Sequence, residues 1–125
     1  MRDFRKLDVW RHAVDLVTKV YQISSQLPDT ERYGLRSQIQ RAAVSIPSNI
    51  AEGASRQSEI EFKHFLEIAI GSSFELETQL ILIQKLGMLS ADQLKETLGL
   101  IEKEQKMLNS LISKLRTSSK PKSNS

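Results

Sequence analysis

The sequence predicts an all-α protein: an up-down-up-down antiparallel four-helix bundle formed by a single domain over residues 1–116. The composition is helical, because Leu, Glu, Lys, Gln and Ala dominate while the 125 residues include only 5 Gly and 3 Pro. In four segments, apolar residues recur at alternating steps of three and four, which predicts helices over about 8–27, 29–54, 58–87 and 90–116. The short connections between these segments favour antiparallel neighbours.

The first predicted helix, 8–27, has an uninterrupted apolar row and a second stripe beside it. Asp8 favours the helix N-terminus, and Pro28 ends the helix because the residue before a proline avoids helical angles. The row is Val9, Ala13, Leu16, Val20, Ile23 and Leu27; the second stripe is Trp10, Val14, Val17 and Tyr21.

The second predicted helix, 29–54, contains a proline. Asp29 and Thr30 offer N-terminal caps, and the apolar pattern continues on both sides of Pro47. A proline inside a helix costs about 3 kcal/mol, so the pattern predicts one helix kinked at Pro47, with two helices meeting at a corner as the alternative. Gly34 weakens the first turn, and Gly53 is a C-terminal signal.

The third predicted helix, 58–87, has clear ends. Ser58 and Glu61 form a capping box at its start, and Gly87 is a C-cap. Its apolar row is Phe62, Leu66, Ala69, Ser73, Leu76, Leu80 and Ile83.

This helix is also apolar well beyond that row. At about 100° per residue, Ile70, Phe74 and Ile81 lie roughly a quarter-turn away, and Ile68 and Leu86 lie on the other side. One partner cannot cover so wide an arc, so the helix is either central in its own bundle or shared with another subunit.

The fourth predicted helix, 90–116, begins with a second capping box, Ser90 and Gln93. Its predicted inward row is Leu94, Leu98, Ile101, Gln105, Leu108, Ile112 and Leu115. Gln105 is the one polar residue in that row, where it fixes register or lies at an exposed end. Residues 117–125 have no apolar residue to bury and are predicted to be a disordered tail.

No constellation of reactive residues stands out, so we predict no enzyme activity, no metal and no cofactor. The absence of cysteine excludes disulfides and thiolate metal sites. His12 and His64 lie on different predicted helices without a convergent second ligand, and each is predicted to be a half-exposed polar residue. The predicted inward rows hold no Glu or His pairs of the di-metal type.

Charge is unevenly distributed along the chain. Residues 1–57 hold nine basic and six acidic side chains, 58–89 hold two and five, and 90–125 hold seven and four. Solvated helix faces that attract one another explain this pattern, and so does a surface that faces a polyanion. The nucleic-acid-binding candidates are Lys6, Arg11, Arg32, Arg36, Arg41 and Arg56. Few aromatic residues are available for stacking, so the expected binding is non-specific.

The candidates for an interface between copies are the surplus apolar residues and a polar stripe beside Pro47. Asn49 and Glu52 belong to that stripe, for which solvent exposure is the alternative; Glu52 also has an i,i+4 partner in Arg56. The full set of interface candidates is Trp10, Tyr21, Asn49, Glu52, Ile70, Phe74 and Ile81.

The chain shows no targeting or membrane signal. No basic region followed by an apolar stretch opens it, and no apolar run approaches the ~20 residues of a membrane span. We therefore expect a soluble cytoplasmic protein without a membrane partner.

Two stretches carry a family resemblance, FRKLDVWRHAVDL and RAAVSIPSNIAEGASRQSEIEFKHFLEIAIGSSFELETQL. They resemble the small four-helix-bundle proteins encoded by intervening sequences in bacterial 23S ribosomal RNA genes, a group similar to the accessory variability determinants of diversity-generating retroelements. The resemblance covers about Phe4 to Leu89, and SIPSNIAEG is its most specific part. It implies a homopentamer around a central axis, and its retroelement members are non-enzymatic accessories that bind nucleic acid and a reverse transcriptase.

These observations together predict a non-enzymatic homo-oligomer, a pentamer, that binds RNA or DNA non-specifically through a basic surface. The alternative is a homo-oligomeric scaffold or accessory factor, for example for a reverse transcriptase, whose partner is a protein and whose charge serves only solubility.

Overall fold

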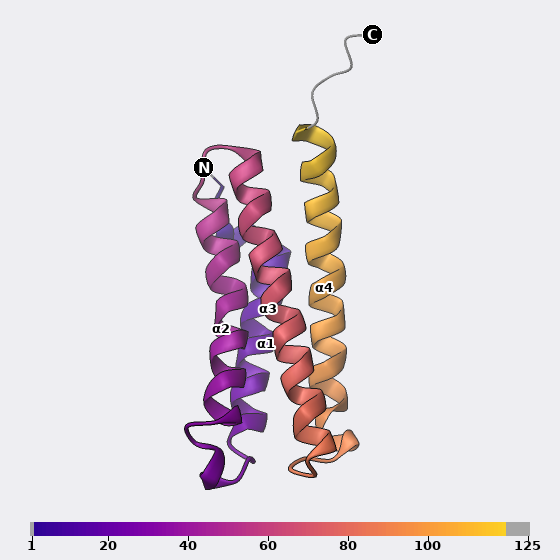
Figure 1. Cartoon of the computed structure of the whole chain (residues 1–125). Helices are drawn as coiled ribbons and strands as arrows, with labels where there is room; N and C mark the ends of the chain where they lie inside the picture. Colours follow the sequence, from indigo (N-terminus) through magenta and orange to yellow (C-terminus); the bar gives the residue numbers. More distant parts are fainter. Residues whose placement is uncertain (1, 120–125) are drawn as a thin grey trace.

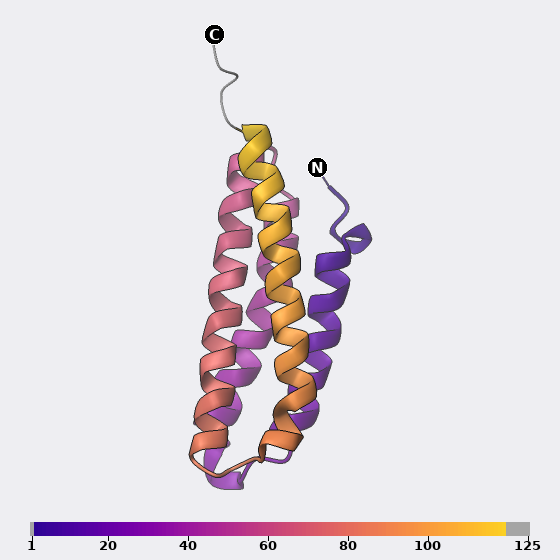
Figure 2. The same ribbon diagram turned by 90° about the vertical axis from the view of Figure 1, so that its right-hand side faces the viewer.

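The computed structural model describes residues 2–119 and shows four long helices packed side by side (Figure 1). The helices are α1 (Asp8–Ser24), α2 (Leu35–Ala54), α3 (Glu59–Lys85) and α4 (Ala91–Ser119), with short 3-10 turns η1 (Phe4–Lys6) and η2 (Asp29–Glu31). Figures 1 and 2 both place the α1–α2 and α3–α4 connections at one end and the α2–α3 connection at the other. The prediction of an all-α chain with four helices is confirmed, and residues 2–119 contain no strand.

Each helix packs closely against two of the others, whereas the diagonal pairs α1–α3 and α2–α4 have no Cα atoms within 8 Å of each other in the described part of the chain. The core is a single cluster to which every helix contributes. Its largest fully buried members include Leu16 of α1, Ile46 of α2, Phe62 of α3 and Leu108 of α4. Within residues 2–119, no helix combines the length and the apolar character that crossing a membrane requires.

The first helix ends at Ser24, earlier than the predicted Leu27. The reason is that the chain tightens ahead of Pro28: the N–H groups of Gln26 and Leu27 donate to the carbonyls of Ile23 and Ser24, three residues back. Leu27 nevertheless reaches the core and is 3 % exposed.

The predicted start of the second helix at residue 29 is wrong. Asp29–Glu31 form the separate turn η2, and Gly34 has non-helical angles (φ −107°, ψ −119°) that interrupt the chain before α2 begins at Leu35. The Glu31 carboxylate accepts a hydrogen bond from the backbone N–H of Leu35 at 3.0 Å, so it caps the helix from outside. The sequence signal at Asp29 and Thr30 therefore belonged to a preceding turn.

Pro47 lies inside one continuous helix. The alternative of two helices meeting at a corner is thus wrong, and Ile46 and Ile50 on either side of the proline are both fully buried. Burial of these two side chains contributes about 1.5–3 kcal/mol each, which offsets the cost of the missing proline N–H.

The predicted caps at both ends of α3 and at the start of α4 are present, except that the Glu61 carboxylate accepts from the Ser58 hydroxyl at 3.4 Å and not from the Ser58 N–H. Ser58 Oγ accepts from the Glu61 N–H, and at α4 the Ser90 and Gln93 side chains each bond the other's backbone N–H. Gly87 has φ +77°, and the N–H groups of Gly87 and Met88 donate to the carbonyls of Gln84 and Ile83. These two bonds are those of a Schellman C-cap.

The fourth helix is longer than predicted, and its inward row differs from the predicted row at two of seven positions. It continues to Ser119, so residues 117–119 of the predicted tail are helical. None of these three residues is Gly or Pro, so nothing in them ends a helix. Residues 120–125 lie outside the described part. Thr97 and Glu104 are fully buried, whereas the predicted row members Leu98 and Gln105 are only half-buried.

Gly53 is not the C-terminal signal that the sequence suggested. It lies inside α2, buried against α3, and a Cβ at this position would come within 2.7 Å of Phe65 Cβ and 3.0 Å of Phe62 Cδ1. The glycine therefore allows the close approach of the two helices.

We predict that Gly53→Ala lowers the free energy of unfolding by about 1–2 kcal/mol, because overpacking costs more than the helix propensity that alanine gains. The control is Gly99→Ala in α4, where an added Cβ would meet nothing within 4 Å. That control should be stabilised by about 0.5–1 kcal/mol. Urea unfolding of both variants measures the difference, and a stabilised Gly53→Ala variant would contradict the close-approach role.

Candidate functional site

The structure spreads the six predicted nucleic-acid-binding residues over both ends of the bundle. The backbone N–H of Arg2 donates to the Ala54 carbonyl at the end of α2. The start of the chain, which carries Lys6 and Arg11, is therefore at the same end of the bundle as Arg56. Arg32 and Arg36 lie at the other end of α2, about 30 Å away for a helix of this length. Arg41 lies between the two groups.

Three of the six are held by partners within the chain. Arg11 pairs with Asp8 at 2.6 Å, and Arg56 pairs with Glu52 at 2.8 Å, the predicted i,i+4 pair. Arg36 bonds the Leu27 carbonyl and lies 3.6 Å from the Asp29 carboxylate, with a side chain only 19 % exposed. These arginines stabilise local structure, and Arg36 in particular ties the α1–α2 connection to α2.

The other three, Lys6, Arg32 and Arg41, are exposed and form no ion pair within residues 2–119. Arg32 and Arg41 belong to a stretch, residues 32–51, that contains three arginines and no Asp or Glu. Tyr33, beside Arg32, is 89 % exposed. Arg32 and Tyr33 lie just before α2, outside the helix predicted for Arg32, and Arg41 lies on α2; we call these three residues the α2 arginine face.

A second basic feature was missed by sequence reasoning. Lys106 and Lys114 of α4 line a groove of about 490 Å³ beside the start of α1, together with Asp8 and Ser110. The apolar side chains in this groove, which we call the α1/α4 groove, are Leu7, Val9, Met107 and Leu111. The net positive charge of residues 90–125 indicated a basic surface on the fourth helix. Helical spacing alone could not show that Lys106 and Lys114 lie beside the start of α1.

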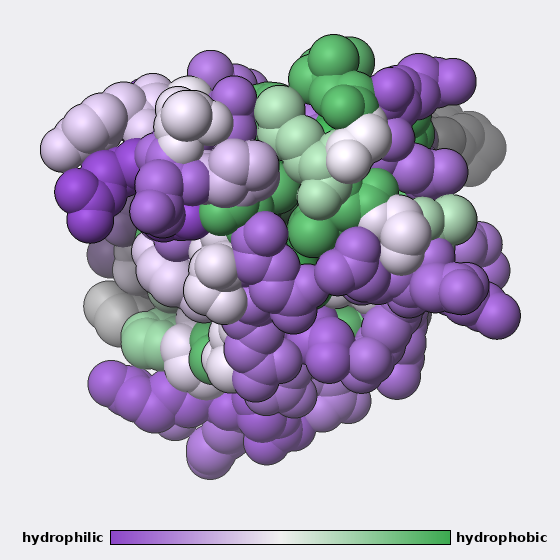
Figure 3. All heavy atoms as spheres, turned by 90° about the horizontal axis from the view of Figure 1, so that it is seen from below, coloured by the Kyte–Doolittle hydropathy of each residue, from purple (hydrophilic) through white to green (hydrophobic). Residues whose placement is uncertain are grey.

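The surplus apolar surface predicted for the third helix is present. Five of the nine large hydrophobic residues exposed in the described chain lie on α3, and a sixth, Leu86, follows directly after its last residue. We call them the α3 apolar face: Ile60, Ile68, Phe74, Ile81, Leu82 and Leu86. Of the predicted interface residues, Phe74 is 51 % exposed and Ile81 40 %, whereas Ile70 is half-buried against the core. Figure 3, seen from the end with the α3–α4 connection, shows hydrophobic side chains gathered on one side and hydrophilic ones opposite.

The remaining interface candidates do not join this face. Trp10 and Tyr21 are on α1, which lies diagonally across the bundle from α3; Trp10 is half-buried with its ring 5.0 Å from that of Phe4. Asn49 donates from Nδ2 to the Ser45 carbonyl and hydroxyl, and so its amide is occupied within the chain. Glu52 is exposed and paired with Arg56.

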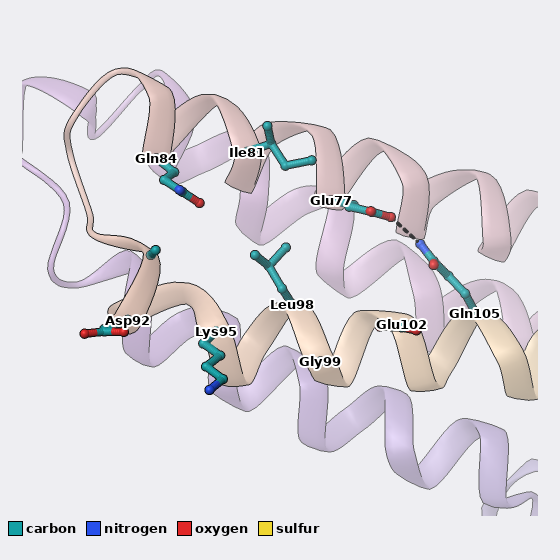
Figure 4. A pocket seen from close by; sticks show the side chains of 10 residues that line it. Glu77, Ile81, Gln84, Asp92, Lys95, Leu98, Gly99, Glu102 and Gln105 are labelled. Carbon is teal, nitrogen blue, oxygen red and sulfur yellow. Dashed lines mark hydrogen bonds between the residues drawn. The ribbon is translucent and has the colours of Figure 1, made fainter.

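A groove with a volume of about 610 Å³ lies between α3 and α4 (Figure 4). Ile81 and Leu98 point toward one another across it, and the Gln105 amide donates to the Glu77 carboxylate at 2.8 Å at one end. Gln105 thus links two helices at the surface and is not a core register residue. The charged residues at the groove, Asp92, Lys95 and Glu102, are spread around it and do not converge.

One polar pair that the sequence did not predict is buried in the α1–α4 contact. His12 Nδ1 lies 2.8 Å from Glu104 Oε1, with side chains 12 % and 0 % exposed. His12 was predicted to be half-exposed. Glu104 was missed because the predicted inward row of the fourth helix contained Leu98 and Gln105. The structure instead buries the residues one position earlier, Thr97 and Glu104.

Both members of the pair disfavour charge. Burial raises the pKa of Glu104 to about 8. Burial also lowers the pKa of His12, with Lys103 adding to the effect and Asp15 opposing it. Near neutral pH the Glu104 carboxyl therefore keeps its proton and donates it to His12 Nδ1. Within residues 2–119 no three His, Asp or Glu side chains are grouped as metal ligands would be, so the pair is an isolated polar contact between helices.

We predict that stability falls as the pH rises from about 6.5 to 8. In this window folded Glu104 binds a proton that the unfolded chain, with a pKa near 4.5, does not bind, so the slope is about −1.4 kcal/mol per pH unit. Below about pH 6.5 the lowered pKa of His12 contributes an increase of stability with pH, because the unfolded chain then binds a proton at His12 that the folded chain does not bind.

Urea unfolding at several pH values measures this slope, and Glu104→Gln should abolish it. Glu102→Gln, an exposed carboxylate two residues away, is the control and should keep the slope. A Glu104→Gln variant with the same pH dependence as the unaltered chain would contradict the assignment.

The comparisons with known proteins agree with this architecture. Residues 5–110 match the model of the family described as 23S rRNA-intervening sequence protein. A crystal structure of a protein of unknown function from the S23 ribosomal protein family of Bacteroides thetaiotaomicron is similar, with a TM-score of 0.78 and 24 % identity. The similarity covers 83 % of this chain and 97 % of that one, and at this identity it shows a shared fold.

No functionally curated protein matches the chain. The family model, in contrast, spans the start of the chain, all of α1 to α3 and most of α4. The chain therefore belongs to the 23S rRNA-intervening sequence protein family.

Proposed function

We propose that this protein is a non-enzymatic homo-oligomer that binds RNA or DNA without sequence specificity through the α2 arginine face. The observation that carries the proposal is the exposed, unpaired state of Arg32 and Arg41 in a stretch free of carboxylates. We take each subunit to be an up-down-up-down antiparallel bundle with α2 bent at Pro47, and we take five subunits to form a cytoplasmic ring.

The chemistry of the arginine face suits phosphates more than bases. A guanidinium group neutralises a phosphate and forms paired hydrogen bonds to it, which supplies affinity without sequence information. Tyr33 is the one exposed aromatic residue beside these arginines, so stacking would contribute at a single position in each subunit.

Association would strengthen this binding. One subunit offers only Arg32 and Arg41 as free guanidinium groups on this face, which is few for stable binding at physiological salt. A ring carries one copy of Arg32 and Arg41 in every subunit. Once one subunit has bound a nucleic acid, the contacts of the other subunits with the same molecule become intramolecular. The exposed α3 apolar face supports association, because a surface of this kind on a soluble domain marks an interaction site.

The second candidate function is a scaffold or accessory factor whose ligand is a protein, for example a reverse transcriptase. The two grooves, with their mixture of apolar and charged side chains, favour this candidate. In that case the arginines would serve solubility only.

An electrophoretic mobility shift with a labelled RNA hairpin and a DNA duplex tests the proposal. We predict binding to both at about 50 mM salt that weakens by more than tenfold at about 200 mM. Arg32→Glu/Arg41→Glu should weaken binding more than tenfold at low salt. Arg36 is left in place because it holds the α1–α2 connection.

The matched control is Lys85→Glu/Lys95→Glu, which makes the same change in net charge on α3 and α4, away from α2. It should bind almost as the unaltered chain does. Absence of binding at low salt, or an equal loss in both double variants, would overturn the role of the α2 arginine face and favour the scaffold.

A further inference from the structure

Two surfaces of this chain carry opposite charge. The first is the middle of the α3 apolar face, where Glu67 and Glu75 flank the exposed Phe74. The second is the α1/α4 groove, lined by Lys106 and Lys114. Glu67, Glu75 and Lys114 form no ion pair within residues 2–119, and Lys106 has only an exposed i,i+4 contact with Glu102.

The spacing of the charges is the same on both surfaces. Glu67 and Glu75 are eight residues apart on α3, and Lys106 and Lys114 are eight residues apart on α4. Eight helical residues span about 12 Å, so both carboxylates can meet both ammonium groups when the two helices lie side by side.

Small residues lie at the midpoints of these two pairs. Gly71 is halfway between the glutamates, and an added Cβ there would meet nothing within 4 Å in its own chain. A glycine in the middle of an exposed helix costs about 1 kcal/mol relative to alanine, and this subunit alone offers no compensation for it. Ser110 is halfway between the lysines and lines the groove. Small residues at both midpoints allow two helices to approach closely.

The apolar parts also correspond. Phe74, three residues after Gly71, is 51 % exposed and projects from the same side of α3. The groove offers Leu7, Val9, Met107 and Leu111 as apolar contacts for it. An aromatic side chain that enters such a site typically contributes much of the binding energy of an interface.

We propose that α3 of one copy docks in the α1/α4 groove of a second copy. Phe74 contacts the apolar side chains of the groove, Gly71 lies opposite Ser110, and the two glutamates pair with the two lysines. The inference rests on the homo-association proposed above and specifies the surfaces that meet.

This contact joins two different surfaces, so it leaves each copy with one free α3 face or one free groove. A contact of this type repeats until a ring closes. Asp8 is the one acidic residue at the groove and is already paired with Arg11, which limits its repulsion of the incoming glutamates. The α2 arginine face takes no part in the contact and stays available to a polyanion.

Charge reversal tests the pairing by light scattering at micromolar concentration. The unaltered chain should be oligomeric, whereas Lys106→Glu/Lys114→Glu and Glu67→Lys/Glu75→Lys should each be monomeric. Mixing the two variants, or combining all four changes in one chain, should restore association, because both arrangements again place opposite charges together. Lys85→Glu/Lys95→Glu should keep the mass of the unaltered chain.

The outcomes separate this inference from the proposed function. A monomeric unaltered chain would overturn both. An oligomeric chain whose two charge-reversed variants stay oligomeric, or fail to recover when combined, would overturn the docking surfaces alone and leave association by another route.

Cysteine cross-linking gives an independent measurement in which no charge is changed, and the chain contains no native cysteine. Gly71→Cys and Ser110→Cys chains, mixed and oxidised, should form a disulfide-linked heterodimer in high yield. Replacing the second partner with Ser48→Cys, an exposed position on α2, should not. Equal yields in the two mixtures would contradict the proposed contact.

Discussion

Burial of apolar rows in one shared core holds this chain together, and α3 has more apolar surface than that core can accept. Leu66, Leu76 and Leu80 of α3 are fully buried, while Phe74 and Leu82 on the same helix are about half exposed. Each large apolar side chain left in water forgoes about 1.5–3 kcal/mol. The constraint is geometric, because a helix at the corner of a four-helix bundle can turn only part of its circumference inward.

The four helix contacts are not equivalent. The α2–α3 contact is close: Gly53 admits the Phe62 and Phe65 side chains, and the hydroxyls of Ser45 and Ser72 lie 2.8 Å apart across it. The α1–α4 contact includes the buried His12–Glu104 pair and opens into a groove at the start of α1. The bundle is thus tightly packed at the α2–α3 contact, whereas the α1/α4 groove has room for a second helix. The helix with exposed apolar surface that needs a partner is α3.

Much of the fold could be predicted because local chemistry determines it. The N-cap at Ser58, the capping box at Ser90 and the C-cap at Gly87 each depend on a few neighbouring residues, and all three are present. The start of α2 was misplaced because the cap at Glu31 acts from outside the helix, across the break at Gly34. Glu104 was missed because rows at steps of three and four can be drawn through either of two neighbouring positions, and only packing against His12 distinguishes them.

The candidate site was less predictable than the fold. Counting arginines on α2 could not show that Arg36 is engaged by the α1–α2 connection while Arg32 and Arg41 are free. Lys106 and Lys114 of α4 lie beside Leu7 because of the position of α1 along α4. That position is set by the packing of the whole bundle and not by local sequence. The surplus of apolar residues on α3 was visible in the sequence, since it follows from helical periodicity alone.

The central claim is that association covers the outer surface of α3 and leaves that of α2 open. Maleimide labelling of single-cysteine chains measures this directly, with Thr78→Cys on α3 and Ser48→Cys on α2, both at exposed positions. The account predicts that Thr78→Cys reacts at least tenfold more slowly at micromolar concentration than after dilution into the monomeric range, while Ser48→Cys reacts at one rate throughout. Equal and concentration-independent rates at the two positions would contradict it.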